Sequence, residues 1–341
     1  MTELEALAHW LPIHGLALAA GARLERLGGG IANRNEGVML ASGPTTFRAV
    51  LRRPPPGPLA AGASDMAREA RVLAALAPHF PLAPRLIAFC ADEAVLGTQF
   101  QLIERRDGAA IAGTLPPASG DGLALVETTL QAMAALHALD PATLGLGDLG
   151  KPEGFYARQL KGWTARAEAV WPDGLPAAVA TLIAGLAAAV PPESGAPVLL
   201  HMDLKPDNLL VDPATCAPLA MIDWDMATRG PRGFDLAVLL SYWIELGDPD
   251  DVKPLLAVPS LSPGWPHRAA VAARYAEISG HAVGDLRWPT ALARLRLAVA
   301  WMQLYRKWQR GEMSGTRYQG FEALALAIIA HALAAYAKGE L

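Results

Sequence analysis

Cysteine is nearly absent from the sequence: only Cys90 and Cys216 occur among its 341 residues. Two cysteines cannot build the disulfide framework of a small secreted scaffold. The sequence also has no Cys-x-x-Cys pair or Cys/His cluster that would hold a structural zinc ion. Cysteine usage of this kind favours a reducing compartment, so we expect a cytoplasmic protein.

Strong net charge and long apolar runs are also lacking. The chain has 29 basic and 33 acidic residues, and its formal net charge of −4 gives no global attraction to nucleic acid or to an anionic membrane. The most apolar runs, 175–191 and 321–336, are Ala-rich and fall short of the roughly 20 residues that span a bilayer, so we interpret them as core helices. The N-terminal stretch has no basic segment before an apolar one, unlike a signal peptide. We expect no nucleic-acid or membrane partner, and the oligomeric state stays open.

A chain of 341 residues suits two lobes, and its pattern changes about a third of the way along. In the first part, 38–53 reads as two strands around a Gly-Pro turn and 99–105 as a third, with a helix that begins at an expected N-cap, Ser64. In the second part helical spacing dominates, in the segments 121–139, 153–170, 176–190, 268–280, 289–310 and 319–337. We predict a small β-rich lobe, 1–106, and a larger, mostly helical lobe, 107–341.

The segment 201–212, HMDLKPDNLLVD, places polar residues directly before a short apolar run. That run and a second one at 219–222 read as two short strands joined by a turn. Asp203, Asn208 and Asp223 are therefore expected at neighbouring strand ends. Phosphoryl transfer needs such groups, because a carboxylate orients the attacking hydroxyl and oxygen ligands hold the Mg²⁺ that bridges the nucleotide phosphates. Alternatively, these could be ordinary turn and cap residues. That interpretation explains any one of them taken alone, but it explains the three together less well.

These residues also carry a family resemblance. The pattern from His201 through Asn208, followed by Ile222-Asp223-Trp224-Asp225, resembles the catalytic signature of the aminoglycoside phosphotransferase and choline kinase-like superfamily. Further segments resemble the branch of that superfamily found fused to acyl-CoA dehydrogenases, namely 28–33, 50–57, 68–76, 136–163 and 300–311. The resemblance implies an α+β, two-lobed protein-kinase-like fold. Its small β-rich N-lobe would bind the nucleotide, and its larger helical C-lobe would be catalytic and bind the substrate.

The resemblance implies a role for each residue of the signature. Asp203 would be the catalytic acid that receives or orients the proton of the substrate hydroxyl, and Asn208 and Asp223 would bind Mg²⁺. Lys205 would neutralise the transferring γ-phosphate, with a solvated turn lysine as the alternative interpretation.

The resemblance also implies supporting roles for two further residues, and the sequence differs from the family pattern at two positions. His201 would orient the catalytic loop, and Asp235 would brace it. Met202 replaces the usual glycine, and Asp225 stands where kinases commonly have a small residue. Neither departure removes a group that the chemistry requires.

In the expected N-lobe, Glu69 should pair with a cation on the strand FRAVLR. Kinases use a lysine there to hold the α- and β-phosphates, whereas the matching position here is Arg52, with Arg53 as the alternative register. Arginine is longer and planar but can bind phosphate through two donors, so the exchange is not conservative. Backbone amides of a Gly-rich loop would approach the phosphates, although a tight hairpin also explains its glycines. The loop residues concerned are Gly29, Gly30 and Asn33.

The expected activity is transfer of the γ-phosphate of ATP or GTP, with Mg²⁺, to a hydroxyl group of a metabolite. The C-terminal region has more cations than acids, which favours an anionic hydroxy acid or hydroxyacyl-CoA over a polycationic antibiotic. Its cations are Arg294, Arg296, Arg306, Lys307, Arg310, Arg317 and Lys338. One alternative is an aminoglycoside or choline-like phosphotransferase. Another is a nucleotide-binding pseudokinase that acts as a regulatory module. The presence of Arg52 is an argument for this alternative, and the presence of Asp203, Asn208 and Asp223 is an argument against it.

Overall fold

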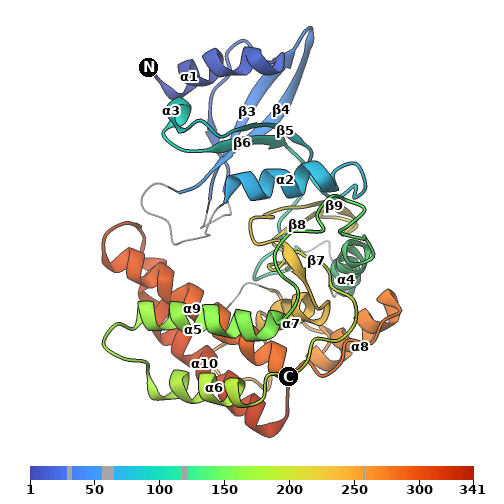
Figure 1. Cartoon of the computed structure of the whole chain (residues 1–341), viewed down its shortest axis with the longest axis vertical. Helices are drawn as coiled ribbons and strands as arrows, with labels where there is room; N and C mark the ends of the chain where they lie inside the picture. Colours follow the sequence, from blue (N-terminus) through green and yellow to red (C-terminus); the bar gives the residue numbers. More distant parts are fainter. Residues whose placement is uncertain (29–32, 56–64, 117–121, 256–257) are drawn as a thin grey trace. The chain divides into compact units, whose positions relative to one another are not determined.

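An antiparallel sheet dominates the N-terminal part of the computed structural model (Figure 1). Its strands run in the order β1-β3-β4-β6-β5, with β2 paired to β3. The strands are β1 (Ala17–Leu18), β2 (Glu25–Arg26), β3 (Arg34–Ser42), β4 (Thr45–Arg53), β5 (Leu86–Cys90) and β6 (Phe100–Glu104). The accompanying helices are α1 (Glu3–Trp10), η1 (Leu11–His14), α2 (Met66–Leu76) and α3 (Glu93–Leu96). The predicted hairpin and third strand are present, whereas β1, β2, β5 and α1 were not predicted.

The structure describes residues 1–28, 33–55, 65–116, 122–255 and 258–341. These residues form two compact units, which we call unit 1 and unit 2. Unit 1 contains Met1–Ala110 and Leu219–Ala227, and unit 2 contains Ile111–Pro218 and Thr228–Leu341. The segment 219–227 thus belongs with the β-rich part of the chain, although it follows much of the helical part in sequence.

The hairpin of β3 and β4 separates an apolar face from a polar one. Gly43, with φ of 57°, makes the turn, because this left-handed conformation suits glycine. Side chains alternate along each strand, so one face packs into the core of unit 1. That core includes Leu7, Val38, Leu40, Ala49 and Leu51. Arg52 pairs across the strands with Asn35, on the opposite face.

Helix α2 begins one residue later than its expected cap. Its N-cap is Asp65, whose side chain accepts a hydrogen bond from the backbone N–H of Arg68 at 3.0 Å. The expectation of Ser64 as N-cap is therefore wrong for this helix, because Asp65 takes that role. Ser64 itself lies outside the described residues. The helix carries Glu69 on its buried side.

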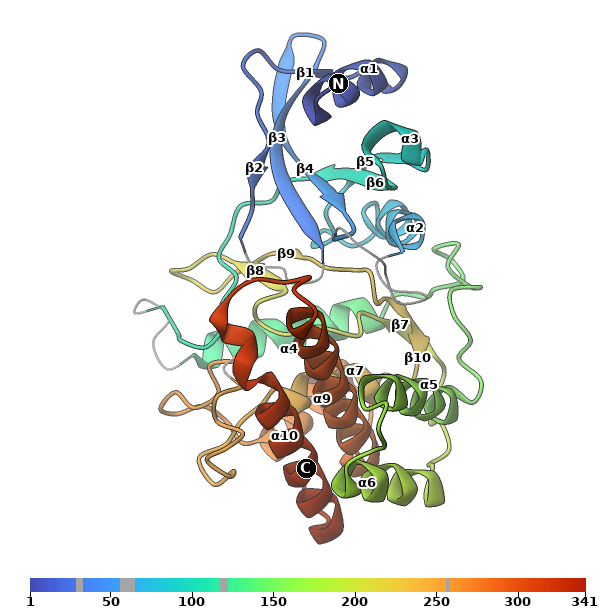
Figure 2. The same cartoon turned by 90° about the vertical axis from the view of Figure 1, so that its left-hand side faces the viewer.

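Unit 2 is mostly helical (Figure 2). Its helices are α4 (Leu123–His137), α5 (Phe155–Val170), α6 (Ala177–Ala188), α7 (Gly233–Ser241), α8 (Arg268–Ser279), α9 (Arg287–Gln309), η3 (Thr316–Gly320) and α10 (Phe321–Lys338). All six predicted helical segments are present, and α7 was not among them. Helix α9 is the central helix of unit 2 and packs against α5, α6, α7 and α10. Its residues from Trp288 to Val299 are buried.

Helix α10 is the apolar run near the C-terminus. Together with η3 it forms one stretch, Thr316–Lys338, which is long and apolar enough to cross a membrane by length and composition. It packs along α9 and buries Leu324, Ile328 and Ile329, so it behaves as a core helix of unit 2.

Short strands occupy the middle of the sequence. β7 (Val198–Leu200) pairs antiparallel with β10 (Thr228–Gly230). The two short strands predicted after the polar segment 201–208 are β8 (Leu209–Val211) and β9 (Pro218–Met221). The carboxylate of Asp212 holds the intervening turn by accepting the backbone N–H groups of Ala214 and Thr215, both at 2.9 Å. The polar segment 201–208 therefore lies between the end of β7 and the start of β8.

Candidate active site

One carboxylate holds the start of the segment 201–208 in unit 2. Asp235, in the first turn of α7, accepts the backbone N–H of His201 at Oδ2 and that of Met202 at Oδ1, each at 2.7 Å. His137 Nε2 lies 3.1 Å from Asp235 Oδ2, and its Nδ1 lies 2.6 Å from the hydroxyl of Tyr275. Asp235 is 1% exposed, so this network is buried. The geometry agrees with the bracing role expected for Asp235.

Two residues of the predicted signature have left-handed backbone conformations. Met202 has φ of 71° and Asp223 has φ of 70°, angles that cost a non-glycine residue roughly 1–2 kcal/mol. This explains why glycine is usual at the position of Met202. The hydrogen bond from its N–H to Asp235 holds the strained turn that leads into Asp203.

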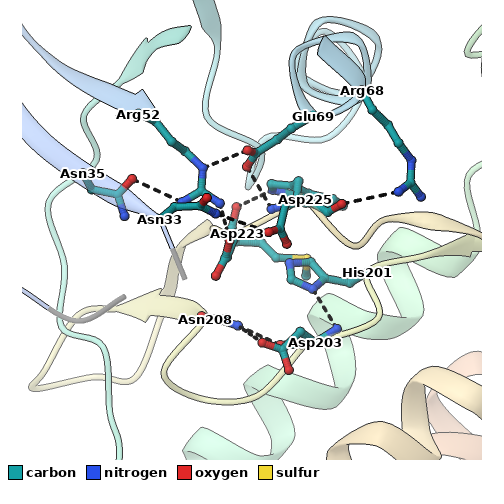
Figure 3. A network of polar contacts seen from close by, with 12 residues as sticks. Asn33, Asn35, Arg52, Arg68, Glu69, His201, Asp203, Asn208, Asp223 and Asp225 are labelled. Carbon is teal, nitrogen blue, oxygen red and sulfur yellow. Dashed lines mark hydrogen bonds and ion pairs between the residues drawn. The ribbon is translucent and has the colours of Figure 1, made fainter. Parts of the chain in front are cut away.

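Three donors converge on the carboxylate of Asp203. Asn208 Nδ2 lies 3.0 Å from Oδ2 (Figure 3). Lys205 Nζ lies 3.1 Å from the same oxygen. The hydroxyl of Tyr242 donates to Oδ1 at 3.0 Å. Burial raises the pKa of Asp203, but the positive charges of Lys205 and Arg296 outweigh it and hold that pKa below its usual value. The carboxylate is therefore ionised at neutral pH.

Asn208 and Lys205 are oriented by the groups around them. Asn208 Nδ2 donates to both the backbone carbonyl and Oδ2 of Asp203, at 2.8 and 3.0 Å, so its Oδ1 points away as a free acceptor. Lys205 Nζ also lies 3.0 Å from Asp207 Oδ1. Burial lowers the pKa of Lys205, but Asp203 and Asp207 raise it to a net value above normal, so the side chain stays protonated.

In unit 1, Arg52 is the centre of a second network. Its Nε donates to Glu69 Oε2 at 2.8 Å, its Nη2 contacts Asp223 Oδ1, and its Nη1 donates to Asn35 Oδ1 at 3.2 Å (Figure 3). Arg52 is 5% exposed and Glu69 is 1% exposed. The backbone N–H of Trp224 donates to Glu69 Oε1 at 3.2 Å. These contacts explain why the segment 219–227 belongs to unit 1.

The register of the cation on β4 is unambiguous. Arg52 meets Glu69, whereas Arg53 points to the other side of the strand. There it contacts Glu3 at 2.7 Å and Glu36 at 2.5 Å. Arg52 is therefore the pairing cation that the sequence favoured, and Arg53 is not.

Asp225 extends the network of unit 1. Asn33 Nδ2 donates to its Oδ2 at 3.2 Å, so the side chain of this predicted loop residue holds an acid. Burial, together with the nearby charges of Asp223 and Glu69, raises the pKa of Asp225 to about 7. Three acids, Glu69, Asp223 and Asp225, thus lie close enough to Arg52 to act on its charge. Gly29 and Gly30 lie outside the described residues.

A metal cage made of protein side chains alone is not found in the described ranges. No group of three or more His, Cys, Asp or Glu side chains there is close enough to hold an ion. Mg²⁺ in phosphoryl transfer usually takes one or two carboxylates and completes its shell with phosphate oxygens and water. Asp223 of unit 1 offers a carboxylate and Asn208 of unit 2 offers an amide oxygen, and both are oxygen donors of the kind that Mg²⁺ binds.

A family model described as "Phosphotransferase enzyme family" matches residues 23–271, well over half of the chain. The chain belongs to this phosphotransferase family. The predicted enzyme class is thereby confirmed. The sequence is 28% identical over 306 residues to the probable acyl-CoA dehydrogenase IBR3 of Arabidopsis thaliana, covering 86% of this chain and 37% of that one. It is 33% identical over 199 residues to human acyl-CoA dehydrogenase family member 11, covering 57% of this chain and 25% of that one. The chain thus spans a quarter to just over a third of these relatives.

Solved structures show the same fold. A Ralstonia eutropha protein assigned to the aminoglycoside phosphotransferases has 25% identity and a TM-score of 0.78, with 98% of both chains covered. The GDP complex of aminoglycoside 2'-phosphotransferase-IIIa has 16% identity and a TM-score of 0.61, with 97% of both chains covered. Choline kinase from Cryptosporidium parvum has 14% identity and a TM-score of 0.63, covering 94% of this chain and 90% of that one. The predicted α+β, protein-kinase-like fold class is therefore confirmed.

Tyr242 is a contact of the phosphotransferase signature that the sequence analysis missed. Asp235 and Tyr242 lie seven residues apart at the two ends of α7, a spacing that puts both on one face of a helix. Asp235 holds the backbone of the loop and Tyr242 holds the carboxylate of Asp203. The i, i+7 spacing from a predicted brace was the signal that would have found it.

The cations near the C-terminus of this phosphotransferase differ in their contacts and burial. Arg306 Nε donates to the carbonyl of Val170 at 2.9 Å, and Arg310 pairs with Glu312 on the surface. Arg294 is sealed inside unit 2, where burial and Arg268 lower its pKa to about 9. Arg296, by contrast, carries its charge close enough to lower the pKa of Asp203. These four cations therefore do not act as one group.

Proposed function

We propose that this chain transfers the γ-phosphate of ATP or GTP, bound with Mg²⁺, to a hydroxyl group of a small metabolite. The observation that carries the proposal is the carboxylate of Asp203, which is ionised and held by Tyr242, Lys205 and Asn208. A carboxylate offers about four lone-pair positions. Lys205 and Asn208 occupy Oδ2 and Tyr242 occupies one position on Oδ1, so one position on Oδ1 stays open for the acceptor hydroxyl.

In the proposed reaction, the acceptor hydroxyl donates its hydrogen bond to the open position on Asp203 Oδ1. As the acceptor oxygen bonds to the γ-phosphorus, Asp203 takes the proton, and the bond from phosphorus to the bridging oxygen breaks to leave ADP or GDP. Lys205 is positioned to balance the charge beside Asp203. Chemistry of this kind depends on positioning and charge, which the three fixed donors provide.

Mg²⁺ would be held by Asp223 and by the free Oδ1 of Asn208, and it would supply charge neutralisation for the nucleotide phosphates. Arg52 would serve the phosphates in place of the usual lysine, with Glu69 holding its Nε. The backbone loop with Gly29 and Gly30 is proposed to approach the same phosphates.

For the acceptor, an anionic hydroxy acid or hydroxyacyl-CoA is favoured over an aminoglycoside or a choline-like amine. Support comes from the relatives named as acyl-CoA dehydrogenases, in which the matching part is a fraction of a longer chain. A panel of hydroxylated metabolites, scored by substrate-dependent ADP or GDP release, tests this preference. Turnover of kanamycin-like polyamines without turnover of any hydroxy acid or hydroxyacyl-CoA would reverse it. Nucleotide binding without any release would favour the pseudokinase.

Nucleotide and Mg²⁺ are expected to stabilise the protein jointly. A ligand at 100 times its Kd stabilises the folded state by about 2.7 kcal/mol, which raises the unfolding midpoint by several degrees. Thermal unfolding should therefore shift upward with ATP or GTP plus Mg²⁺, and Asp223→Ala should remove most of the Mg²⁺-dependent part.

The matched control for this measurement is Asp173→Ala, which removes an exposed acid of unit 2 and should keep the full shift. No shift with any combination of nucleotide and Mg²⁺ would contradict nucleotide binding. An equal Mg²⁺-dependent shift in Asp223→Ala would contradict the assigned metal ligand.

A further inference from the structure

A cavity of unit 1 lies on the face of the sheet that carries Arg52. Its volume is about 510 Å³, which is within the range of small-molecule sites. Its lining residues, all in unit 1, include Ala19, Ala20, Glu25, Gly37, Met39 and Arg48. Because side chains alternate along a strand, Gly37 and Met39 share the face of Asn35 on β3. By the same rule, Arg48 shares the face of Arg52 on β4.

The sheet face extends from Arg52 in one direction only, toward this cavity. Strand β4 ends at Arg53 and its partner β3 begins at Arg34, so the hairpin does not continue past Arg52. Arg52 Nη1 donates to Asn35 Oδ1 at 3.2 Å (Figure 3), and Gly37 follows two residues later, roughly 7 Å along the strand. The ribose separates a base from its phosphates. A nucleotide with its phosphates at Arg52 can therefore place its base at the cavity.

Arg105 forms part of the cavity wall, next to Gly37. It follows directly after β6, and its backbone N–H donates to the carbonyl of Arg48 at 3.5 Å. Its Nη1 lies 2.7 Å from the point where a side chain at residue 37 would carry its Cβ. Atoms essentially never approach a Cβ closer than 3.0 Å, so the guanidinium can lie there only because residue 37 is glycine.

The charge of Arg105 is not neutralised as the other arginines of the cavity are. Arg48 pairs with Asp107, and Arg23 pairs with Glu25 at 2.9 Å. In the described parts of the chain, the side chain of Arg105 makes neither an ion pair nor a hydrogen bond. A guanidinium has only N–H donors, held in a planar fork, and no acceptor. The donors of Arg105 are thus available for a ligand with two neighbouring acceptors.

We propose that Arg105 binds the base of the nucleotide and selects GTP over ATP. The inference rests on the proposed function and names which of the two phosphoryl donors is used. Guanine presents two neighbouring acceptors, O6 and N7, which a guanidinium binds with two parallel N–H donors. Adenine presents N7 beside an amino group at N6, so one N–H of Arg105 would face another donor. The difference between the two bases lies at the atoms that Arg105 contacts.

The test is a titration of the whole chain with GTP, ATP and ITP in the presence of Mg²⁺ and without acceptor. The three carry identical phosphates, so the ratio of their Kd values reports the base alone. We expect GTP to bind about 10- to 100-fold more tightly than ATP, the effect of one bidentate contact. ITP should bind like GTP, because its base keeps O6 and N7 and lacks only the 2-amino group.

Variants of Arg105 separate this contact from the rest of the site. Arg105→Ala should weaken GTP and ITP by the same factor and leave ATP nearly unchanged. Arg105→Lys should keep only part of the preference, since an ammonium cannot match two acceptors with a planar fork. In steady-state kinetics, Arg105→Ala should raise the KM for GTP far more than it lowers kcat, because the base does not change during phosphoryl transfer.

Arg85→Ala is the matched control. Arg85 is an exposed arginine of the same unit that pairs with Glu104 and does not line the cavity. Its loss should leave the ratio of the GTP and ATP Kd values unchanged. An equal change of this ratio in Arg85→Ala and Arg105→Ala would contradict a specific role of Arg105.

The outcomes separate this inference from the proposed function. Equal binding of GTP and ATP, tighter binding of ATP, or an unchanged ratio in Arg105→Ala would overturn the inference and leave the proposed reaction standing. Much weaker binding of ITP than of GTP would also overturn it, because recognition would then depend on the 2-amino group. A GTP preference that depends on Arg105, without GDP release on any acceptor, would support the inference and overturn the proposed reaction.

Discussion

Asp203→Asn is expected to lower kcat by roughly 10²–10⁴-fold and to leave nucleotide affinity nearly unchanged. The amide keeps the shape of the carboxylate but neither its charge nor its ability to take a proton. Its NH₂ group would also face one of the donors that now point at the carboxylate, Tyr242, Lys205 or Asn208. Steady-state kinetics on a confirmed acceptor measure the loss, and nucleotide titration shows whether binding survives.

Tyr242→Phe is the graded control for Asp203→Asn. It removes one neutral donor from Oδ1 and leaves the proton acceptor in place, so its effect on kcat should be much smaller. Full turnover by Asp203→Asn would show that the carboxylate does not take the proton, and the assignment of the catalytic segment would then be wrong.

Arg52→Ala is expected to lower the free energy of unfolding by about 3–5 kcal/mol, in addition to weakening nucleotide binding. The substitution leaves Glu69 buried without a cation and removes the counter-charge of Asp223 and Asp225. An unpaired buried charge is far more unfavourable than a lost surface ion pair. Denaturant unfolding in the absence of nucleotide measures the effect.

Arg53→Ala is the matched control for Arg52→Ala, because Arg53 is the next residue of the same strand and also pairs with two acids. Both variants should be less stable, but Mg²⁺ should restore stability only in Arg52→Ala, where it can replace the lost cation beside Asp223. Equal responses of the two variants to Mg²⁺ would contradict a cation site at Asp223 and Asp225.

The polar segment 201–208 and the strand after it could be predicted from the sequence, because short-range spacing sets where a loop ends and a strand begins. The sequence also favoured Arg52 over Arg53 as the partner of Glu69, and alternation along β4 places these two arginines on opposite faces of the strand. The contact of Arg52 with Asp223 joins residues 171 positions apart, and no local pattern encodes such a distance.

The same limit applies to the cations near the C-terminus. A count of cations makes no distinction between Arg296, Arg306 and Arg310. In the structure, Arg306 donates to a backbone carbonyl and Arg310 pairs with a neighbouring glutamate, and Arg296 makes neither of these contacts. Which face of α9 each one occupies depends on how α5 and α7 pack against it. At α2, Ser64 and Asp65 are both good caps, and sequence preference alone cannot choose between adjacent ones.

The membership of 219–227 in unit 1 has a consequence for biosynthesis. Glu69 emerges from the ribosome long before Trp224 and Asp223, which supply its backbone donor and the second carboxylate on Arg52. During those roughly 150 residues of translation, all strands of the unit 1 sheet have been made, but the segment 219–227 that completes the unit has not. A fragment cut at residue 110 is permanently in that state. Unit 1 can therefore finish folding only after residue 227 has been made, although most of its sequence ends at residue 110.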